Sequence, residues 1–238
     1  MRRETVRLQR TNTSALLNGL RFLDSFFPSG GFAYSSGLEA AVQGGMVKNP
    51  EDLSRYVTDL FRNGIGRREA VVAGLGHDAL TQGKLSLALD ADRELEAMQL
   101  GQESRLASRQ MGRQVMRIAA EQFPGSTVVQ NFQASIDAGT TPGHVPIAMG
   151  LTLGAAGWDR ESAVGGYLHQ TAVGFVSAAL KLLPIGQRDG QRLLEQWTPL
   201  IAELSRSVRP ELKLSSWTPI QDIYAMRHSR LESRLFRS

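Results

Sequence analysis

Apolar residues recur at helical spacing along most of the chain. The clearest stripe has apolar side chains at positions i, i+3, i+4, i+7 and i+8, one face of an amphipathic helix: Leu53, Tyr56, Val57, Leu60 and Phe61. Asn49 and Pro50 precede this stripe as an N-cap and a first helical residue, so a helix beginning there is expected. Strands would need alternating Val, Ile and Thr with Asn-Gly turns, and these are nearly absent. The pattern therefore predicts an all-α fold.

The stripes and the breaks between them divide the chain into about nine to ten helices, given the usual helix length. The expected helical segments are 16–27, 32–42, 50–63, 67–80, 84–100, 101–122, 128–136, 144–157, 159–181 and 191–205. We expect a single compact helical domain over residues 14–208. A flexible N-terminal segment, 1–13, would precede it, and a basic C-terminal tail, 209–238, would follow it.

A Gly-rich bend between two apolar faces distinguishes residues 24–45. The first face is expected to be Leu16, Leu20, Leu23 and Phe27, stopped by Pro28. The second is expected to be Phe32, Tyr34, Leu38, Ala41 and Val42, closed by Gly44 and Gly45. One interpretation is a packing unit whose glycines allow close backbone approach. The other is a phosphate cradle, although GxGxxG, GxxxxGK[ST] and a preceding strand are all missing.

The segment 101–122 combines an apolar face with a row of arginines. We expect an inward face of Leu106, Met111, Val115 and Ile118. The arginines are spaced four residues apart: Arg105, Arg109, Arg113 and Arg117. The favoured interpretation is a solvated face paired with Glu103 and Glu121; the alternative is a surface that grips phosphates or an acidic partner.

Two later segments have a clear helical signature. Residues 144–157 are apolar nearly all round and rich in Gly and Ala, which is typical of a buried central helix. Asp159 is expected to cap the next helix, which Pro184 ends. The segment 191–205 continues the helical pattern despite Pro199.

The charge of the chain is concentrated at its C-terminal end. The whole chain has 27 basic and 23 acidic residues and a net charge of +4. Residues 205–238 hold seven basic and three acidic residues, so this stretch accounts for the full +4 and the preceding body is balanced. A balanced body is unlike a domain that tracks phosphates. Three interpretations of the tail stay open: a solvated or disordered end, a partner-docking segment, or a nucleic-acid contact.

No combination of residues indicates catalysis or a resident metal. The chain has no cysteine, which excludes disulfides and thiolate catalysis and fits a reducing compartment. Its four histidines have no ligand spacing such as HExxH, and GxSxG is missing. His144 and His228 would be the better metal candidates because they lie near a loop and the tail. We therefore expect neither an enzyme nor a stable metal site.

The cytoplasm is the expected location. No apolar run approaches the roughly 18 residues that a membrane span needs. The basic start MRRETVRLQR lacks the apolar core of a secretory signal.

Several segments resemble the UreF family of urease accessory proteins. The run PSGGFAYSSGLE at 28–39 resembles the family signature P-x-G-x-[FY]-x-[YH]-S-x-G-L-E. Further similar segments follow in the family's order: RLASRQMGRQ at 105–114, HVPIAMG at 144–150, SAALKLLPIGQ at 177–187 and MRHSRLESRLFRS at 226–238. Ala33 departs from the pattern, since serine or threonine is frequent there. The first dozen residues add nothing to the resemblance.

The resemblance implies an all-α, non-catalytic scaffold that forms a homodimer and assists nickel insertion into urease. The implied partners are UreD (also called UreH), the GTPase UreG and, through the complex, the urease apoprotein. Nickel would be handled by the complex and not held as a cofactor, and neither nucleic acid nor a membrane is an expected partner. A helical nucleic-acid-binding regulator is the alternative function, suggested by the positive net charge and the arginine row.

Partner contacts are expected in the opening bend, at the end of the 159–181 helix and in the tail. Tyr34, Glu39 and Arg234 would form a polar cluster when the tail orders against the bend. The resemblance implies that Lys181 regulates GTP hydrolysis by the partner; alternatively, its charge only favours the negative end of its helix. The complete set of expected partner-binding residues is Tyr34, Glu39, Lys181, Gln187, Tyr224, Arg227, His228, Arg234, Leu235, Phe236 and Arg237.

Overall fold

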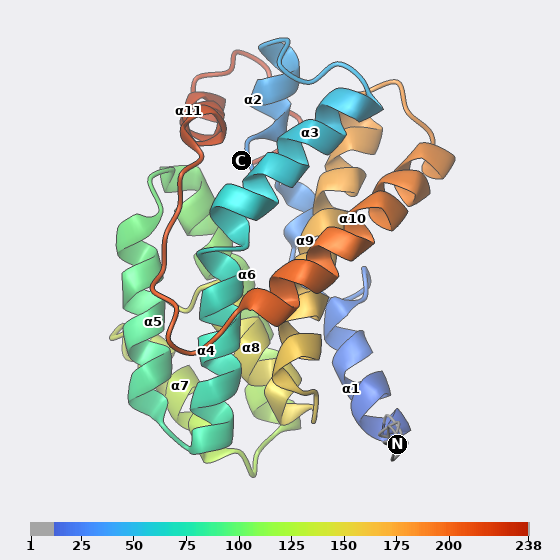
Figure 1. Ribbon diagram of the computed structural model, residues 1–238. Helices are drawn as coiled ribbons and strands as arrows, with labels where there is room; N and C mark the ends of the chain where they lie inside the picture. The colour runs from blue at the N-terminus through green and yellow to red at the C-terminus, as the bar shows by residue number, and fades with distance from the viewer. Residues whose placement is uncertain (1–11, 238) are drawn as a thin grey trace, which may run out of the picture.

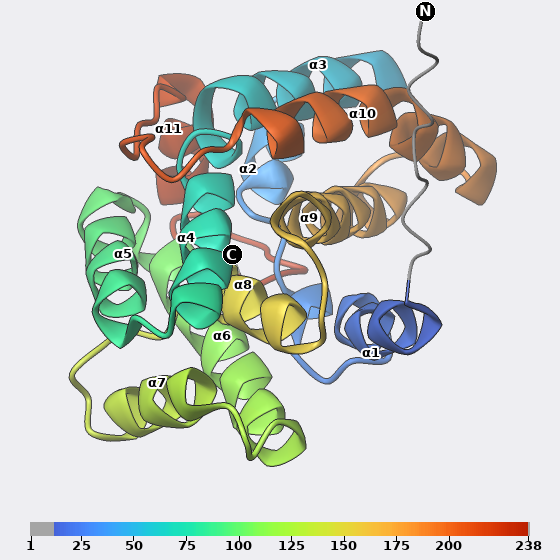
Figure 2. The same cartoon turned by 60° about the horizontal axis from the view of Figure 1, so that its bottom comes forward.

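The apolar segment that follows His144 forms the central helix of the fold. In the computed structural model, which describes residues 12–237, this helix is α8 (Val145–Ala155). It packs against α4 (Glu69–Gln82), α6 (Gln102–Gln122) and α9 (Arg160–Leu182), as Figure 1 and Figure 2 show from two directions. Most of its side chains are buried. A segment that is apolar on every side is thus covered on every side, as predicted.

Glycines allow α4 and α8 to cross at very short range. A Cβ atom added to Gly150 would lie 2.0 Å from the carbonyl oxygen of Ala73, and one added to Gly76 would lie 2.8 Å from that of Ile147. Both distances are shorter than a real Cβ contact, so only glycine fits at these two positions. The crossing fixes the centre on which the other helices pack.

The remaining helices surround this centre. Their bounds are α1 (Thr13–Leu23), α2 (Leu38–Gln43), α3 (Pro50–Leu60), α5 (Leu85–Met98), α7 (Thr127–Asp137), α10 (Gln187–Ser207) and α11 (Pro219–His228). A short 3₁₀ turn covers Gly31–Ala33, and a π-helical turn, Phe61–Ile65, lies between α3 and α4. Helices α3 and α10 lie side by side across the top of Figure 2. The described residues contain eleven α-helices and no strand, which confirms the all-α prediction.

The predicted helix starts are confirmed where a cap and an apolar stripe coincide. The side chain of Asn49 accepts a hydrogen bond from the backbone N–H of Asp52 at 2.8 Å, and Asp159 does the same for Ser162 at 2.8 Å. The stripe on α3 is buried along its whole length. Local signals were sufficient here because a cap satisfies backbone donors whatever the rest of the fold does.

The prediction for the first two segments is partly wrong. Helix α1 ends at Leu23 and not at Phe27, because Asp24 is extended and its carboxylate accepts the N–H of Phe26 at 2.7 Å. Leu16 and Leu20 are 38% and 44% exposed and do not form the buried stripe, whereas Phe22 is buried. The second helix starts only at Leu38, which leaves Phe32 outside it, 77% exposed in the 3₁₀ turn. On α6, Leu106 is 54% exposed and does not face inward.

The C-terminal tail is folded, so the interpretation as a disordered end is wrong. Its backbone N–H groups at Ser215 and Trp217 donate to the carbonyls of Arg67 and Asn63, at 3.1 and 2.8 Å. The segment then forms α11, which packs against α2 and α6 (Figure 1). Residues 1–11, which include most of the predicted flexible N-terminal segment 1–13, lie outside the described residues, as does Ser238. Within residues 12–237, no helix combines the length and the apolar character needed to cross a bilayer.

Candidate partner-docking site

A buried glutamate at the start of α2 holds the end of the chain. Glu39 is fully buried, and its carboxylate accepts hydrogen bonds from the backbone N–H groups of Leu235 and Phe236 at 2.7 and 3.1 Å. It also faces His228 Nε2 at 2.9 Å. The preceding Gly37 lets α11 approach, since a Cβ there would lie 3.0 Å from the backbone of Ala225. The signature segment, residues 28–39, thus provides the carboxylate to which the tail binds.

His228 joins this glutamate to a second one on α6. Its Nδ1 lies 2.8 Å from Glu103 Oε2, and the other oxygen of Glu103 accepts from Arg234 at 3.0 Å. We refer to Glu39, Glu103, His228 and Arg234 as the C-terminal clasp. A carboxylate only accepts hydrogen bonds, so both ring nitrogens of His228 can be satisfied together only when both carry a proton. The clasp therefore consists of two carboxylates joined by an imidazole ring and flanked by one guanidinium group.

The donors around Glu39 keep its carboxyl group ionised. Burial alone would raise its pKa, but the N–H of Leu235, the ring of His228 and the N–H of Phe236 outweigh burial and hold the pKa below its usual value. A charged carboxylate that accepts several hydrogen bonds is a strong anchor for a chain end.

Two further contacts fix the last residues. Phe236 is buried, and the Nζ of Lys181 lies 5.1 Å from the centre of its ring. The N–H of Arg237 donates to the carbonyl of Ala33 at 2.8 Å. The tail end therefore touches the opening bend and the last turn of α9 at once.

The outward side of the tail is strongly apolar. Its exposed large apolar residues are Leu212 (45%), Trp217 (80%), Ile220 (49%), Ile223 (44%), Met226 (44%) and Leu235 (71%). The guanidinium of Arg227 lies 5.9 Å from the ring of Tyr224, which itself packs where Gly44 has no side chain. Several large apolar side chains left exposed on one segment, together with exposed arginines, are typical of a protein interface.

The predicted polar cluster is only partly present. Glu39 and Arg234 are connected, although through His228 and Glu103 and not directly. Tyr34 is not a member, because its hydroxyl donates to Gln110 at 2.8 Å. Nothing in the spacing of the chain pointed to Glu103, since it lies 125 residues from His228 and 131 from Arg234.

The predicted partner-binding residues divide by exposure. Glu39, His228 and Phe236 are buried and hold the tail to the body. Tyr224 is half-buried, and Arg227, Leu235 and Arg237 are exposed on the tail. Lys181 is exposed near the end of α9, and Gln187 is exposed as the first residue of α10. Direct contact with a partner is therefore available to the exposed members, whereas the buried ones act by positioning the tail.

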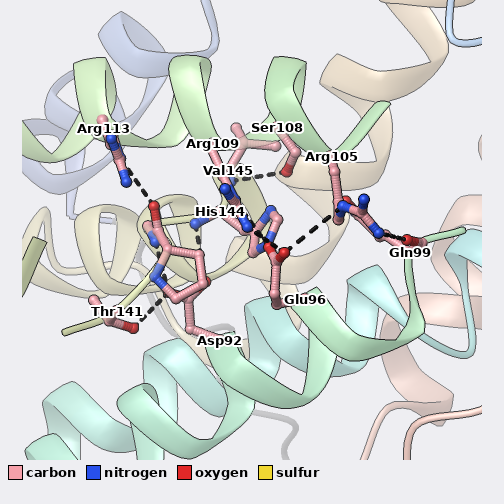
Figure 3. A network of polar contacts seen from close by, with 12 residues as sticks. Asp92, Glu96, Gln99, Arg105, Ser108, Arg109, Arg113, Thr141, His144 and Val145 are labelled. Carbon is pink, nitrogen blue, oxygen red and sulfur yellow. Dashed lines mark hydrogen bonds and ion pairs between the residues drawn. The ribbon is translucent and has the colours of Figure 1, made fainter. Parts of the chain in front are cut away.

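A second buried polar network lies inside the body (Figure 3). The carboxylate of Asp92 on α5 accepts from the Thr141 hydroxyl and from the backbone N–H groups of Gly143 and His144, at 2.7, 2.6 and 2.9 Å. One turn later, Glu96 faces His144 Nε2 at 2.8 Å. We refer to Asp92, Glu96 and His144 as the body network. It fixes the loop that leads into α8.

The arginine row does not pair as predicted. Arg105 and Arg109 form ion pairs with Glu96 on α5, and Glu103 is committed to the clasp. Figure 3 shows both guanidinium groups reaching from α6 toward Glu96. Burial by itself would raise the pKa of Glu96. The contacts with Arg109 and His144 outweigh burial and hold this pKa below its usual value. The row was expected to be a solvated face; its first half instead fastens α6 to α5.

Neither histidine singled out as a metal candidate is placed for that role. His144 and His228 each face glutamates within the two networks. Among residues 12–237, no group of three or more histidine, aspartate or glutamate side chains is arranged to hold a metal ion. What these arrangements provide is a docked chain end with an apolar outer surface.

Comparison with known proteins identifies relatives over nearly the whole chain. The sequence model of the UreF family matches residues 47–198. A urease accessory protein UreF of Bacillus sp. (strain TB-90) is 30% identical over 94% of this chain and 99% of its own length. UreF of Actinobacillus pleuropneumoniae serotype 5b is 33% identical, covering 92% and 97%, and UreF of Haemophilus influenzae (strain KW20 / Rd) is 30% identical, covering 99% of each.

Proposed function

The chain belongs to the UreF family of urease accessory proteins, and from this premise we propose that it is a scaffold that bridges UreD and the GTPase UreG during nickel insertion into urease. The relatives are named as accessory proteins, and the chain is accordingly not an enzyme. The observation that carries the proposal concerns the C-terminal segment. The clasp fastens this segment to the body, and several of the segment's large apolar side chains remain exposed. This segment is the proposed docking element for UreD.

The docking proposal is tested by changing only the outward side of α11. The double variant Ile220→Glu/Ile223→Glu should lose co-purification with UreD and keep a helical circular-dichroism spectrum. The control is Gln191→Glu/Gln196→Glu on α10, which adds two carboxylates at exposed positions of another helix, and it should retain UreD. Deleting residues after Ser216 should also abolish the complex. Retention of UreD by the truncated chain would exclude the tail as its docking element.

Regulation of the GTPase is proposed to involve Lys181. Its exposed ammonium lies near the end of a long helix and beside the docked Phe236, so it would sense whether the tail is in place. The Lys181→Ala variant should assemble with UreD normally yet fail to support nickel-dependent urease activation with UreG. Normal activation would leave Lys181 with its local role at the helix end.

We infer the remaining features from the family premise. Two copies of the chain pair, the protein works in the cytoplasm, and nickel is cargo of the assembled complex and not a resident cofactor. The exposed leucines of α1, Leu16, Leu17 and Leu20, support pairing because they give a second copy an apolar face to cover. Sedimentation of the isolated chain tests this inference.

A further inference from the structure

The arginine row of α6 divides into a paired half and an unpaired half. Arg105 and Arg109 share Glu96. Arg113 donates through Nε to the carbonyl of Pro142 at 3.0 Å, and Arg117 donates to the side chain of Gln114 at 2.7 Å. Within residues 12–237, neither Arg113 nor Arg117 has a carboxylate within 4.0 Å. Both side chains are exposed, so their positive charges are not neutralised by the described part of the chain.

These two arginines border a groove between α6 and α7. The groove has a volume of about 750 Å³, and its lining includes Arg113, Arg117, Leu106, Gln110, Ile136 and Asp137. Figure 2 shows the two helices that form its walls. Asp137 is its only acidic lining residue, and it accepts a hydrogen bond from Gln133 at 2.8 Å. Leu106, 54% exposed, adds an apolar patch to a basic groove.

We propose that this groove binds an acidic segment of a partner protein. Arg113 and Arg117 are one helical turn apart, so they match carboxylates that are also one turn apart on a helix. The fork of a guanidinium group pairs with a carboxylate through two parallel hydrogen bonds. The exposed Leu106, two turns before Arg113 on α6, receives an apolar side chain that lies two turns from those carboxylates. The inference rests on the proposed scaffold function and names the chemistry of one of its contacts.

The groove is continuous with the docking site through one hydrogen bond. Gln110, which lines the groove, accepts from the hydroxyl of Tyr34 in the opening bend. A partner that contacts the opening bend at Tyr34 is therefore next to the groove. A nucleic acid is a poorer occupant, because it needs a longer track of positive charge and the groove places Asp137 among only a few arginines.

The test measures peptide binding to the full chain alone, so that it does not depend on any urease partner. The probe is a fluorescein-labelled helical peptide with two glutamates four residues apart and a leucine two turns away from them, and binding is followed by fluorescence anisotropy. A matched peptide has glutamine in place of each glutamate. We expect the acidic peptide to bind at least about tenfold more tightly than the glutamine peptide, as charge-assisted pairs require.

Charge reversal locates the binding site. The variant Arg113→Glu/Arg117→Glu should weaken binding by about tenfold or more. Its control, Arg188→Glu/Arg192→Glu, reverses two exposed arginines with the same spacing on α10 and should bind as the unchanged chain does. Circular dichroism and gel filtration verify that both variants are folded.

Three results would overturn the proposal: no binding of the acidic peptide, an equal loss in both double variants, or tighter binding of a single-stranded DNA oligonucleotide at the same arginines. The last would identify a phosphate-binding surface. Because UreD and UreG are absent from the assay, a failure of the proposed bridging function would leave the peptide result unaffected.

Discussion

His144 and His228 are both buried against glutamates, yet their surroundings differ. Burial lowers the pKa of His144, whose Nε2 lies 2.8 Å from Glu96, while no described residue bonds to Nδ1. His228 faces a carboxylate on each side and bridges them. The two rings therefore differ in how many carboxylates they contact directly: one for His144 and two for His228.

The two networks also hold different kinds of structure. The body network ties α5 and α6 to the loop before α8, at the centre of the fold. The clasp ties a chain end to α2 and α6, at a surface where the outer side of the tail is exposed. Loss of the first should weaken the whole domain, whereas loss of the second should free one segment.

The largest effect is expected from Asp92→Asn. The amide group cannot accept at both oxygen positions, so at least one of the buried donors at Thr141, Gly143 and His144 is left unsatisfied. We expect a loss of about 2–4 kcal/mol in the free energy of unfolding, measured by urea titration. The control is Asp90→Asn on the same helix, where the side chain is 75% exposed. Equal stability of the two variants would contradict a central role for the network.

A smaller and local effect is expected from Glu39→Gln. Its carboxylate serves two backbone N–H groups and His228, and an amide leaves some of these buried donors unpaired. Docking of the tail should weaken by about 1–3 kcal/mol while global unfolding changes less. Limited trypsin digestion should then cut the tail arginines earlier than in the unchanged chain or in the exposed control Glu51→Gln. A tail that stays protected would show that the clasp is not what holds it.

The smallest effect is expected in how tail protection depends on pH in the unchanged chain and in Glu39→Gln. Because the pKa of Glu39 is held below its usual 4.5, its stabilisation is complete above that pH and is lost as the pH falls through the lowered pKa. Glu96 shares this direction, so the whole body also weakens in acid. Tail protection in the unchanged chain, measured here by amide hydrogen exchange because trypsin is inactive in acid, should therefore approach that of Glu39→Gln as the pH falls from 6 to 3. A difference that is already lost above pH 4.5 would mean that the pKa of Glu39 is not lowered in the clasp.

Much of the fold followed from local patterns. The caps at Asn49 and Asp159, the stripe on α3 and the fully apolar α8 were all predicted, because each depends on residues within a few turns of one another. The family followed in the same way from short contiguous motifs, which the relatives confirm over nearly the whole chain. These features belong to the sequence by itself.

The tertiary structure decided which side chains meet. Glu39 and His228 lie 189 residues apart, and no spacing rule connects them, so their contact exists only once α11 crosses α2. The same reason explains why Leu16 and Leu106 were assigned inward and are exposed: an apolar residue on a helix is buried only where another helix covers it. The pairing of Arg109 with Glu96, and the absence of any such described partner for Arg113 and Arg117, likewise depend on where α5 ends beside α6. Local sequence specifies helices and their apolar faces, whereas burial and charge pairing are properties of the packing between them.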